Sequence, residues 1–296
     1  MGEGELLAGD GVTQGIVRIG DTVRRPLRPF SLTVQAYLAH LRDAGFTGAP
    51  LPLGVDEQGR EMLSFVPGEV HCHPLPPEAA GDEVLVALAR LIRALHEASA
   101  GWVPPPGAVW GGTPATTGRP VTGRAELVSH RDYATGNVVF RGGLPAALID
   151  FDLAMPTTRL YDIANALWYW APFKWGDPRD RAPALAEADI PHRVAVFADA
   201  YGMTARHRAE LAPFAVDMAR RYHEDSRASA ELDPVFRRHW EDGGKDVLPR
   251  AGAWLREAAP AITARLAVPA SWSCPASSSL PNPGELAPGL RSMPLA

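Results

Sequence analysis

Short apolar runs separated by glycine-containing turns occupy the first 66 residues and predict a small antiparallel β unit with one helix. Gly20 and Asp21 stand between two of these runs, and such a two-residue connection is a hairpin signal. A helix is predicted from Ser31 to about Ala44, because its apolar residues recur three and four positions apart. The predicted strands cover residues 5–7, 16–19, 22–25 and 61–66.

The apolar period becomes helical from Asp82, and a buried helix is predicted as far as Glu97. Residues 101–122 are rich in Pro, Gly and Thr and predict a long loop, which is either functional or a tolerated insertion. Beyond this loop the pattern returns to regular elements. These are strands at 127–129, 138–140 and 146–149, and then helices from Asp162 to about Ala267.

The patterns place the protein in the α+β class and divide the chain into three parts. Residues 1–68 are predicted to form a small β lobe, and residues 69–267 a mainly helical lobe. Residues 268–296 contain six prolines, six serines and no helical period. We therefore expect the last segment to be a disordered tail.

Charge and cysteine content exclude several classes of partner. The 29 basic and 34 acidic residues give a net charge of −5, so the chain offers no basic field for nucleic acid. It contains no uncharged apolar stretch of about 18 residues, so no membrane span is expected. The two cysteines, Cys72 and Cys274, are too few for a disulfide framework and fit a reducing cytoplasm. The first 30 residues do not resemble a secretory leader.

One polar motif stands out: His130-x-Asp132-x4-Asn137, followed by a hairpin and then by Asp150-Phe151-Asp152. The outer ends of two hairpin strands meet, so Asn137 and Asp150 are expected to be neighbours. Asp132 precedes them by one loop turn at the same end. Two carboxylates and a carboxamide then converge, and each offers the hard oxygen that Mg²⁺ prefers.

Such a convergence is what phosphoryl transfer from ATP requires, because metal ions neutralise the phosphates and a carboxylate deprotonates the incoming hydroxyl. Asp132 is the candidate base. Asn137 and Asp150 are the candidate metal ligands. His130 is expected to pack beneath the loop and to hold its backbone by hydrogen bonds.

This motif, with the segments Leu148 to Asp152 and Arg159 to Ala164, resembles the aminoglycoside phosphotransferase family. The resemblance is clearest over residues 127–167. It implies a bilobal protein-kinase-like fold, the cofactors ATP and Mg²⁺, and phosphate transfer to a hydroxyl of a small molecule. It also implies that Asp162 is a buried structural acid that anchors the catalytic loop.

The nucleotide lobe departs from the family pattern, which commonly uses a strand lysine paired with a helix glutamate to hold the phosphates. No lysine precedes Lys174, so Arg24 or Arg25 must serve, and strand alternation points only one of them inward. The resemblance places the first arginine at that position, which favours Arg24. The helix from Ser31 offers Gln35 but no glutamate in its first half, so the ion pair is expected to be missing.

Two other segments could touch the nucleotide. Gly11 belongs to a glycine-rich stretch whose small residues would let backbone N–H groups approach a phosphate, although turns between strands use the same residues. Ser64 and Val66 fall where the resemblance places the hinge between the lobes, which would present backbone groups to adenine. The alternative for this segment is a plain edge strand.

The acceptor side is less defined. An aromatic cluster that includes Trp168 and Trp170 either lines the acceptor cleft or belongs to the core, and Asp152 is a further lining candidate. Residues 151–267 hold 17 acidic and 16 basic residues, which does not favour a polycationic acceptor. The alternative to an enzyme is a degenerate kinase-like protein that binds a nucleotide or a partner.

Overall fold

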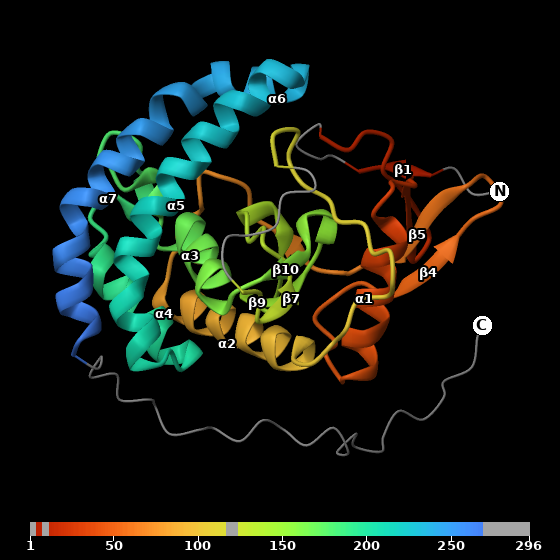
Figure 1. Ribbon diagram of the computed structural model, residues 1–296, viewed down its shortest axis with the longest axis horizontal. Coiled ribbons are helices and arrows are strands. Elements are labelled where there is room, and N and C mark those ends of the chain that lie inside the picture. Colours follow the sequence, from red (N-terminus) through yellow and green to blue (C-terminus); the bar gives the residue numbers. More distant parts are fainter. Residues whose placement is uncertain (1–3, 8–11, 117–123, 269–296) are drawn as a thin grey trace, which may run out of the picture.

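The computed structural model describes residues 4–7, 12–116 and 124–268, and these residues form a small β lobe beside a larger helical lobe (Figure 1). The α+β, bilobal, kinase-like class expected from the sequence is therefore confirmed. Two predictions lie outside the described residues. These are the phosphate-binding role of Gly11 and the disorder of the tail after residue 268.

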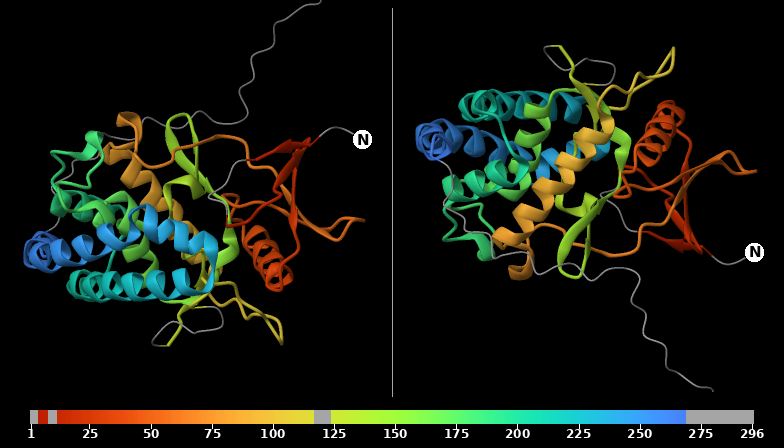
Figure 2. Two further views of the ribbon diagram at one scale, coloured as in Figure 1. Left: turned by 90° about the horizontal axis from the view of Figure 1, so that it is seen from above. Right: turned by 90° about the horizontal axis from the view of Figure 1, so that it is seen from below.

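The small lobe is a five-stranded antiparallel sheet with the strand order β1-β2-β3-β5-β4, and one helix packs against it (Figure 2). Gly20 turns the β2–β3 hairpin with a φ of 59°, a conformation that glycine adopts without strain. The elements of this lobe are β1 (Glu5–Leu6), β2 (Val17–Ile19), β3 (Thr22–Pro26), α1 (Ser31–Asp43), β4 (Pro52–Val55) and β5 (Arg60–Ser64).

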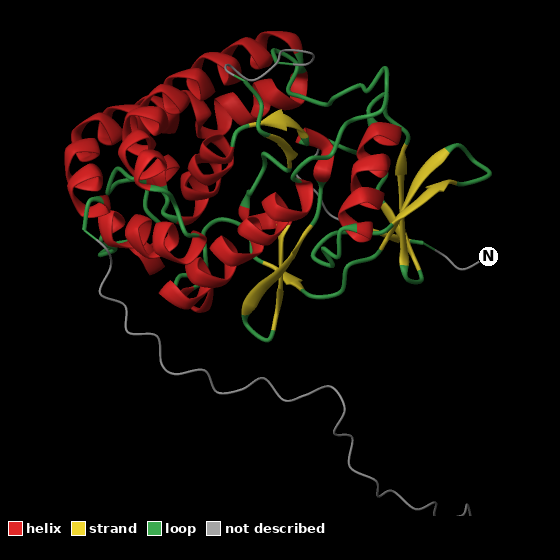
Figure 3. Cartoon of the chain, turned by 60° about the horizontal axis from the view of Figure 1, so that its bottom comes forward, coloured by secondary structure: helices red, strands yellow, loops and turns green. Residues whose placement is uncertain are grey.

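Helices build most of the large lobe, and two small antiparallel sheets lie on the side that faces the small lobe (Figure 3). None of the helices in the described ranges is long and apolar enough to cross a membrane. The helices are α2 (Asp82–Ser99), α3 (Arg159–Trp170), α4 (Ile190–Tyr201), α5 (Ala205–Leu232), α6 (Pro234–His239) and α7 (Lys245–Leu266). The strands are β6 (Glu69–Val70), β7 (Leu127–Ser129), β8 (Val138–Arg141), β9 (Leu144–Leu148) and β10 (Met155–Thr157).

A continuous hydrophobic core joins the two lobes. Tyr37 of α1 is fully buried, and its ring lies 5.0 Å from that of Trp102. The Tyr37 hydroxyl donates to the carbonyl of Val128 in β7, 2.9 Å away. Helix α1 is therefore fixed to both lobes, and it holds the sheet in place above the loops that carry the polar motif.

Candidate active site

The loop between β7 and β8 holds Asp132 from two directions. The Asp132 backbone N–H donates to Nδ1 of His130, 3.2 Å away. At the other end of the loop, Nδ2 of Asn137 donates to Oδ2 of Asp132 at 2.9 Å and to its carbonyl at 3.2 Å. The structure therefore brings the candidate base and one candidate metal ligand into direct contact.

His130 ties this loop to the end of β9. Its Nε2 lies 2.8 Å from the carbonyl of Ile149, which can only accept a hydrogen bond. Since Nδ1 accepts from the Asp132 N–H, the ring is neutral and carries its proton on Nε2. His130 is fully buried, and this burial lowers the pKa of its imidazole.

The β8–β9 hairpin brings Asp150 to the same end as Asn137. The N–H of Ile149 donates to the carbonyl of Asn137 at 2.9 Å, and Asp150 is the next residue. Asp150 has a φ of 63°, which is uncommon for a residue other than glycine and often occurs at functional sites. Its side chain is 49% exposed, so the carboxylate is open to a ligand.

The donor groups fit a hard cation. Because Nδ2 of Asn137 is engaged with Asp132, its Oδ1 is the atom left for a metal, and Asp150 adds a carboxylate oxygen. No group of three or more His, Cys, Asp or Glu that could hold a metal occurs among the described residues. A magnesium ion held by Asn137 and Asp150 would therefore complete its shell with phosphate oxygens and water.

Arg25, and not Arg24, faces this centre. Its guanidinium lies 3.5 Å from Oδ1 of Asp150 and 2.7 Å from Oδ1 of Asp152. Arg24 instead pairs with Asp56, 3.5 Å away. The choice of Arg24 was wrong because successive residues of a strand point to opposite faces, and β3 turns its Arg25 face toward the large lobe.

The ion pair expected to be missing is present, but its carboxylate comes from a strand. Glu61 of β5 lies opposite Arg25 in the ladder, is fully buried, and lies 2.7 Å from the Arg25 Nε. The Ser31 hydroxyl and Nε2 of Gln35 also donate to Glu61, at 3.0 and 3.2 Å. The sequence reasoning missed Glu61, although the pairing of β3 with β5 was the signal that could have found it.

Asp152 lies against Arg25 of the small lobe and does not line the cavity that borders Asp132. Its carboxylate contacts Arg25, and burial together with the charge of Asp150 raises its pKa to about 7, against the opposite effect of Arg25. The suggestion that Asp152 lines the acceptor cleft is therefore wrong. The structure makes it one of three carboxylates, with Glu61 and Asp150, around the guanidinium of Arg25.

Asp162 lies fully buried on α3, behind the loop that carries Asp132. It accepts a 2.6 Å hydrogen bond from the Tyr133 hydroxyl, and Nε2 of His96 lies 3.1 Å away. Burial alone would raise the pKa of Asp162, but the hydrogen bond and charge of His96 lower it below its ordinary value. One turn further along α3, Oδ1 of Asn165 accepts the backbone N–H of Tyr133 at 2.9 Å.

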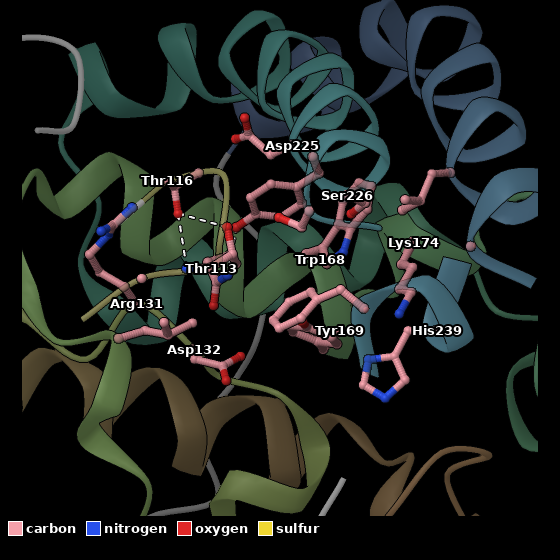
Figure 4. A pocket seen from close by; sticks show the side chains of 18 of the residues that line it. Thr113, Thr116, Arg131, Asp132, Trp168, Tyr169, Lys174, Asp225, Ser226 and His239 are labelled. Atoms are coloured by element: carbon pink, nitrogen blue, oxygen red, sulfur yellow. Dashed lines mark hydrogen bonds between the residues drawn. The ribbon is translucent and has the colours of Figure 1, made fainter. Parts of the chain in front are cut away.

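A cavity of about 320 Å³ opens beside Asp132 and is the candidate acceptor site (Figure 4). Hydrogen-bonded Thr113 and Thr116 form part of its wall. Trp168 lines this cavity, whereas Trp170 is fully buried and donates its indole N–H to the Tyr133 carbonyl, 2.8 Å away. The two rings differ because residues two apart on a helix point to nearly opposite sides, so a lining role for Trp170 was wrong.

The hinge prediction is only partly compatible with the structure. The Ser64 N–H donates to the Leu51 carbonyl at 2.9 Å, and its hydroxyl accepts from the Leu51 N–H at 2.8 Å. The Ser64 amide therefore belongs to the sheet and cannot donate to adenine. Val66 lies in the connection between β5 and β6, and its contact with a nucleotide stays a prediction.

Comparison with known proteins adds a second line of evidence. The phosphotransferase enzyme family matches residues 112–232. Over 276 residues the chain is 30% identical to the trifolitoxin immunity protein of Rhizobium leguminosarum bv. trifolii, a match that covers 90% of this chain and 100% of that protein.

Two solved structures share the fold. A choline/ethanolamine kinase family protein from Mesorhizobium loti superposes with a TM-score of 0.58 at 17% identity, covering 90% of this chain and 92% of the other. The aminoglycoside phosphotransferase APH(2'')-Ib, in its ADP-bound structure, gives a TM-score of 0.52 at 10% identity, covering 86% and 94%.

The fold and the site thus define a kinase-like protein, with a small sheet facing a helical lobe across a polar loop. Within that class, the chain belongs to the phosphotransferase enzyme family, the aminoglycoside phosphotransferase family that its motifs resemble. This membership makes it a phosphotransferase.

Proposed function

We propose that the protein transfers the γ-phosphate of ATP to a hydroxyl of a small molecule and depends on Mg²⁺. Asp132 acts as the base, Asn137 and Asp150 hold the metal, and Arg25 holds nucleotide phosphates. Bound at that position, Mg²⁺ would offset the negative charge of the phosphate groups. The acceptor hydroxyl gives its proton to Asp132, its oxygen bonds to the γ-phosphorus, and the bond to the ADP oxygen breaks.

One observation carries this proposal. Asp132 both contacts Asn137 at 2.9 Å and lines the cavity of about 320 Å³, so a single carboxylate borders the candidate metal site and the candidate acceptor site. General base catalysis requires such a position, because the base must reach the hydroxyl while the phosphoryl group lies close by. Arg25 closes the opposite side, where it contacts Asp150.

The name of the 30% identical relative suggests a biological use. That protein is named for immunity to a toxin, and phosphorylation of a hydroxyl is one way to inactivate a small toxic molecule. We therefore include toxin modification among the uses of the proposed activity. A protein that only binds a nucleotide or a partner is the alternative, since family membership alone does not require turnover.

Titration calorimetry with ATP, with and without Mg²⁺, tests the proposal. An enzyme of this kind should bind ATP at least about tenfold more tightly with the metal, because Asp150 and the phosphates share it. Asp150→Ala should remove most of that metal dependence. Equal affinity with and without Mg²⁺ in the unchanged protein would contradict the metal site, and GTP in place of ATP tests the identity of the nucleotide.

A further inference from the structure

Lys174 brings a cation into the acceptor cavity. It follows α3 in a short 3-10 turn, Phe173–Trp175, and lines the cavity with Asp132 and Tyr169 (Figure 4). Its ammonium lies 4.8 Å from the ring centre of Trp175 and 5.8 Å from that of Tyr169. Aromatic faces therefore position this charge, by cation–π attraction.

Within the part of the chain that the structure describes, the ammonium forms no close ion pair, and the one carboxylate whose charge acts on it is that of Asp132. Throughout the described ranges, Nζ of Lys174 makes no hydrogen bond and no ion pair, although the residue is half-buried. Burial lowers the pKa of Lys174, and the charge of Asp132 acts in the opposite direction. A desolvated ammonium with three unused N–H donors gains most from an anion that enters the cavity.

The position of Lys174 indicates that this anion belongs to the acceptor molecule and not to the nucleotide. The charge of Asp132, which borders the same cavity, acts on Lys174, whereas Asp150 and Asp152 lie against Arg25 of the small lobe. Arg131 also lines the cavity, with its guanidinium 4.5 Å from the Tyr161 ring centre. Two cations, Arg131 and Lys174, thus face the cavity together with two carboxylates, Asp132 and Asp225, of which Asp132 is the candidate base.

We propose that the acceptor is a hydroxy acid, that is, a hydroxyl-bearing molecule with a carboxylate that pairs with Lys174. The aromatic walls, including Trp168 and Tyr169, pack against its apolar part, and its hydroxyl faces Asp132. Lys174 also offsets the repulsion between the incoming carboxylate and the Asp132 charge. The role of the hydroxyl rests on the proposed function, whereas the carboxylate site rests on the cavity alone.

Matched ligand pairs test the proposal by calorimetry on the full chain. The probes are the N-acetyl derivatives of serine, homoserine and tyrosine, each compared with its C-terminal amide. In at least one pair, the carboxylate should bind about tenfold or more tightly than the amide, as expected for a charge-assisted hydrogen bond. Lys174→Met should abolish this preference and Lys174→Arg should retain it, with thermal unfolding as a check on folding.

Lys245, the only other lysine of the chain, provides the control. It is exposed at the start of α7, so Lys245→Met should retain the full preference. Because the chain has two lysines, ¹³C-dimethylation gives two lysine NMR signals, and only that of Lys174 should shift when a carboxylate probe binds.

Three results would overturn the proposal: equal binding of carboxylate and amide in every pair, a preference that survives Lys174→Met, or no binding by any of the six probes. Failure of the phosphotransferase proposal is detected separately, by titrating ATP and Mg²⁺ without a probe. If the protein prefers the carboxylate probes but binds ATP equally well with and without Mg²⁺, the carboxylate site is supported and the transfer reaction is rejected.

Discussion

Among single residues, Arg25 connects the two lobes most directly. Its guanidinium contacts Glu61 of the small lobe and Asp150 and Asp152 of the large lobe. Both Arg25 and Glu61 are buried, so removing one partner would leave an uncompensated charge. The same guanidinium is suited to phosphate, since its planar fork can form two parallel hydrogen bonds.

Arg25→Met should weaken ATP binding by about tenfold to a hundredfold, because a charge-assisted phosphate contact is lost. It should also lower the free energy of unfolding by about 3 kcal/mol, since Glu61 stays buried without its partner. Calorimetry and urea denaturation measure the two effects. The double variant Arg25→Met, Glu61→Gln should recover stability but not affinity. Arg24→Met is the matched control, and an equal loss of affinity there would contradict the assignment.

Asp132→Asn should reduce turnover by about a thousandfold, the range expected for loss of a general base. ATP affinity should change by less than about threefold, because Asp132 lies on the acceptor side of the candidate metal site. The amide replaces the carboxylate at nearly equal volume and can still accept from Asn137. The measurement is ATP consumption with an acceptor found by screening hydroxyl compounds, and unchanged turnover would exclude Asp132 as the base.

At the scale of elements, helix α3 positions the loop that carries Asp132, the proposed base. Asp162 and Asn165 lie three residues apart on one face, and both bind Tyr133, the neighbour of Asp132. The side chain of Thr158 caps the helix by accepting from the Tyr161 N–H at 3.2 Å. Asn165 also donates to the Tyr222 hydroxyl of α5 at 2.7 Å, so it connects the loop to the wall of the acceptor cavity.

Asn165→Leu should lower the free energy of unfolding by about 2 kcal/mol, because the buried Tyr133 N–H loses its acceptor. The catalytic rate should fall while the KM for ATP stays unchanged, which identifies a positioning residue and not a nucleotide contact. Tyr222→Phe is the control, since it removes the α5 partner and keeps the bond to Tyr133. If both variants lower the rate equally, the effect comes from the cavity wall and not from the loop.

The elements that carry the polar motif could be predicted from the sequence. Gly142 and Gly143 have positive φ values and turn the β8–β9 hairpin, so the meeting of Asn137 with Asp150 followed from the turn. Strands β4, β6 and β10 were not predicted, because they have two to four residues and β4 and β10 contain proline. Strands this short depend on their partners and not on their own pattern.

Which side chain of a pair faces the site could not be predicted. Alternation assigns opposite faces to Arg24 and Arg25, and helical geometry does the same for Trp168 and Trp170. The sequence does not state which face the other lobe covers, because that depends on how the sheet and α3 pack. Glu61 was missed for the same reason, since its role appears only when β3 pairs with β5.

At the scale of the whole molecule, the continuous core predicts that the two lobes unfold together. Tyr37 is buried in this core and connects helix α1 to strand β7 of the large lobe. The protein should therefore unfold in one transition, in which tryptophan fluorescence and far-ultraviolet circular dichroism change together. Separate transitions would show that the lobes are independent.

The pH dependence of this transition should reveal the buried neutral His130. Folding lowers the pKa of His130 below the ordinary histidine value of about 6.5. Below pH 6.5 the unfolded chain therefore binds a proton at this residue more readily than the folded protein does. The stability that His130 contributes is therefore complete above that pH and is lost as the pH falls. Asp152, whose pKa is raised to about 7, acts with the opposite sign, so the wild-type curve alone is ambiguous.

Subtracting the curve of His130→Gln from that of the wild type removes the contribution of Asp152, since both proteins share it. We expect the difference in unfolding free energy to be about 2 kcal/mol at pH 8, for the lost bonds to Ile149 and Asp132, and to shrink steadily from pH 6.5 to pH 5. Asn165→Leu changes no titratable group, so its difference should stay constant. A His130 difference that is equally flat would mean that the imidazole takes up a proton without breaking its bonds to the loop.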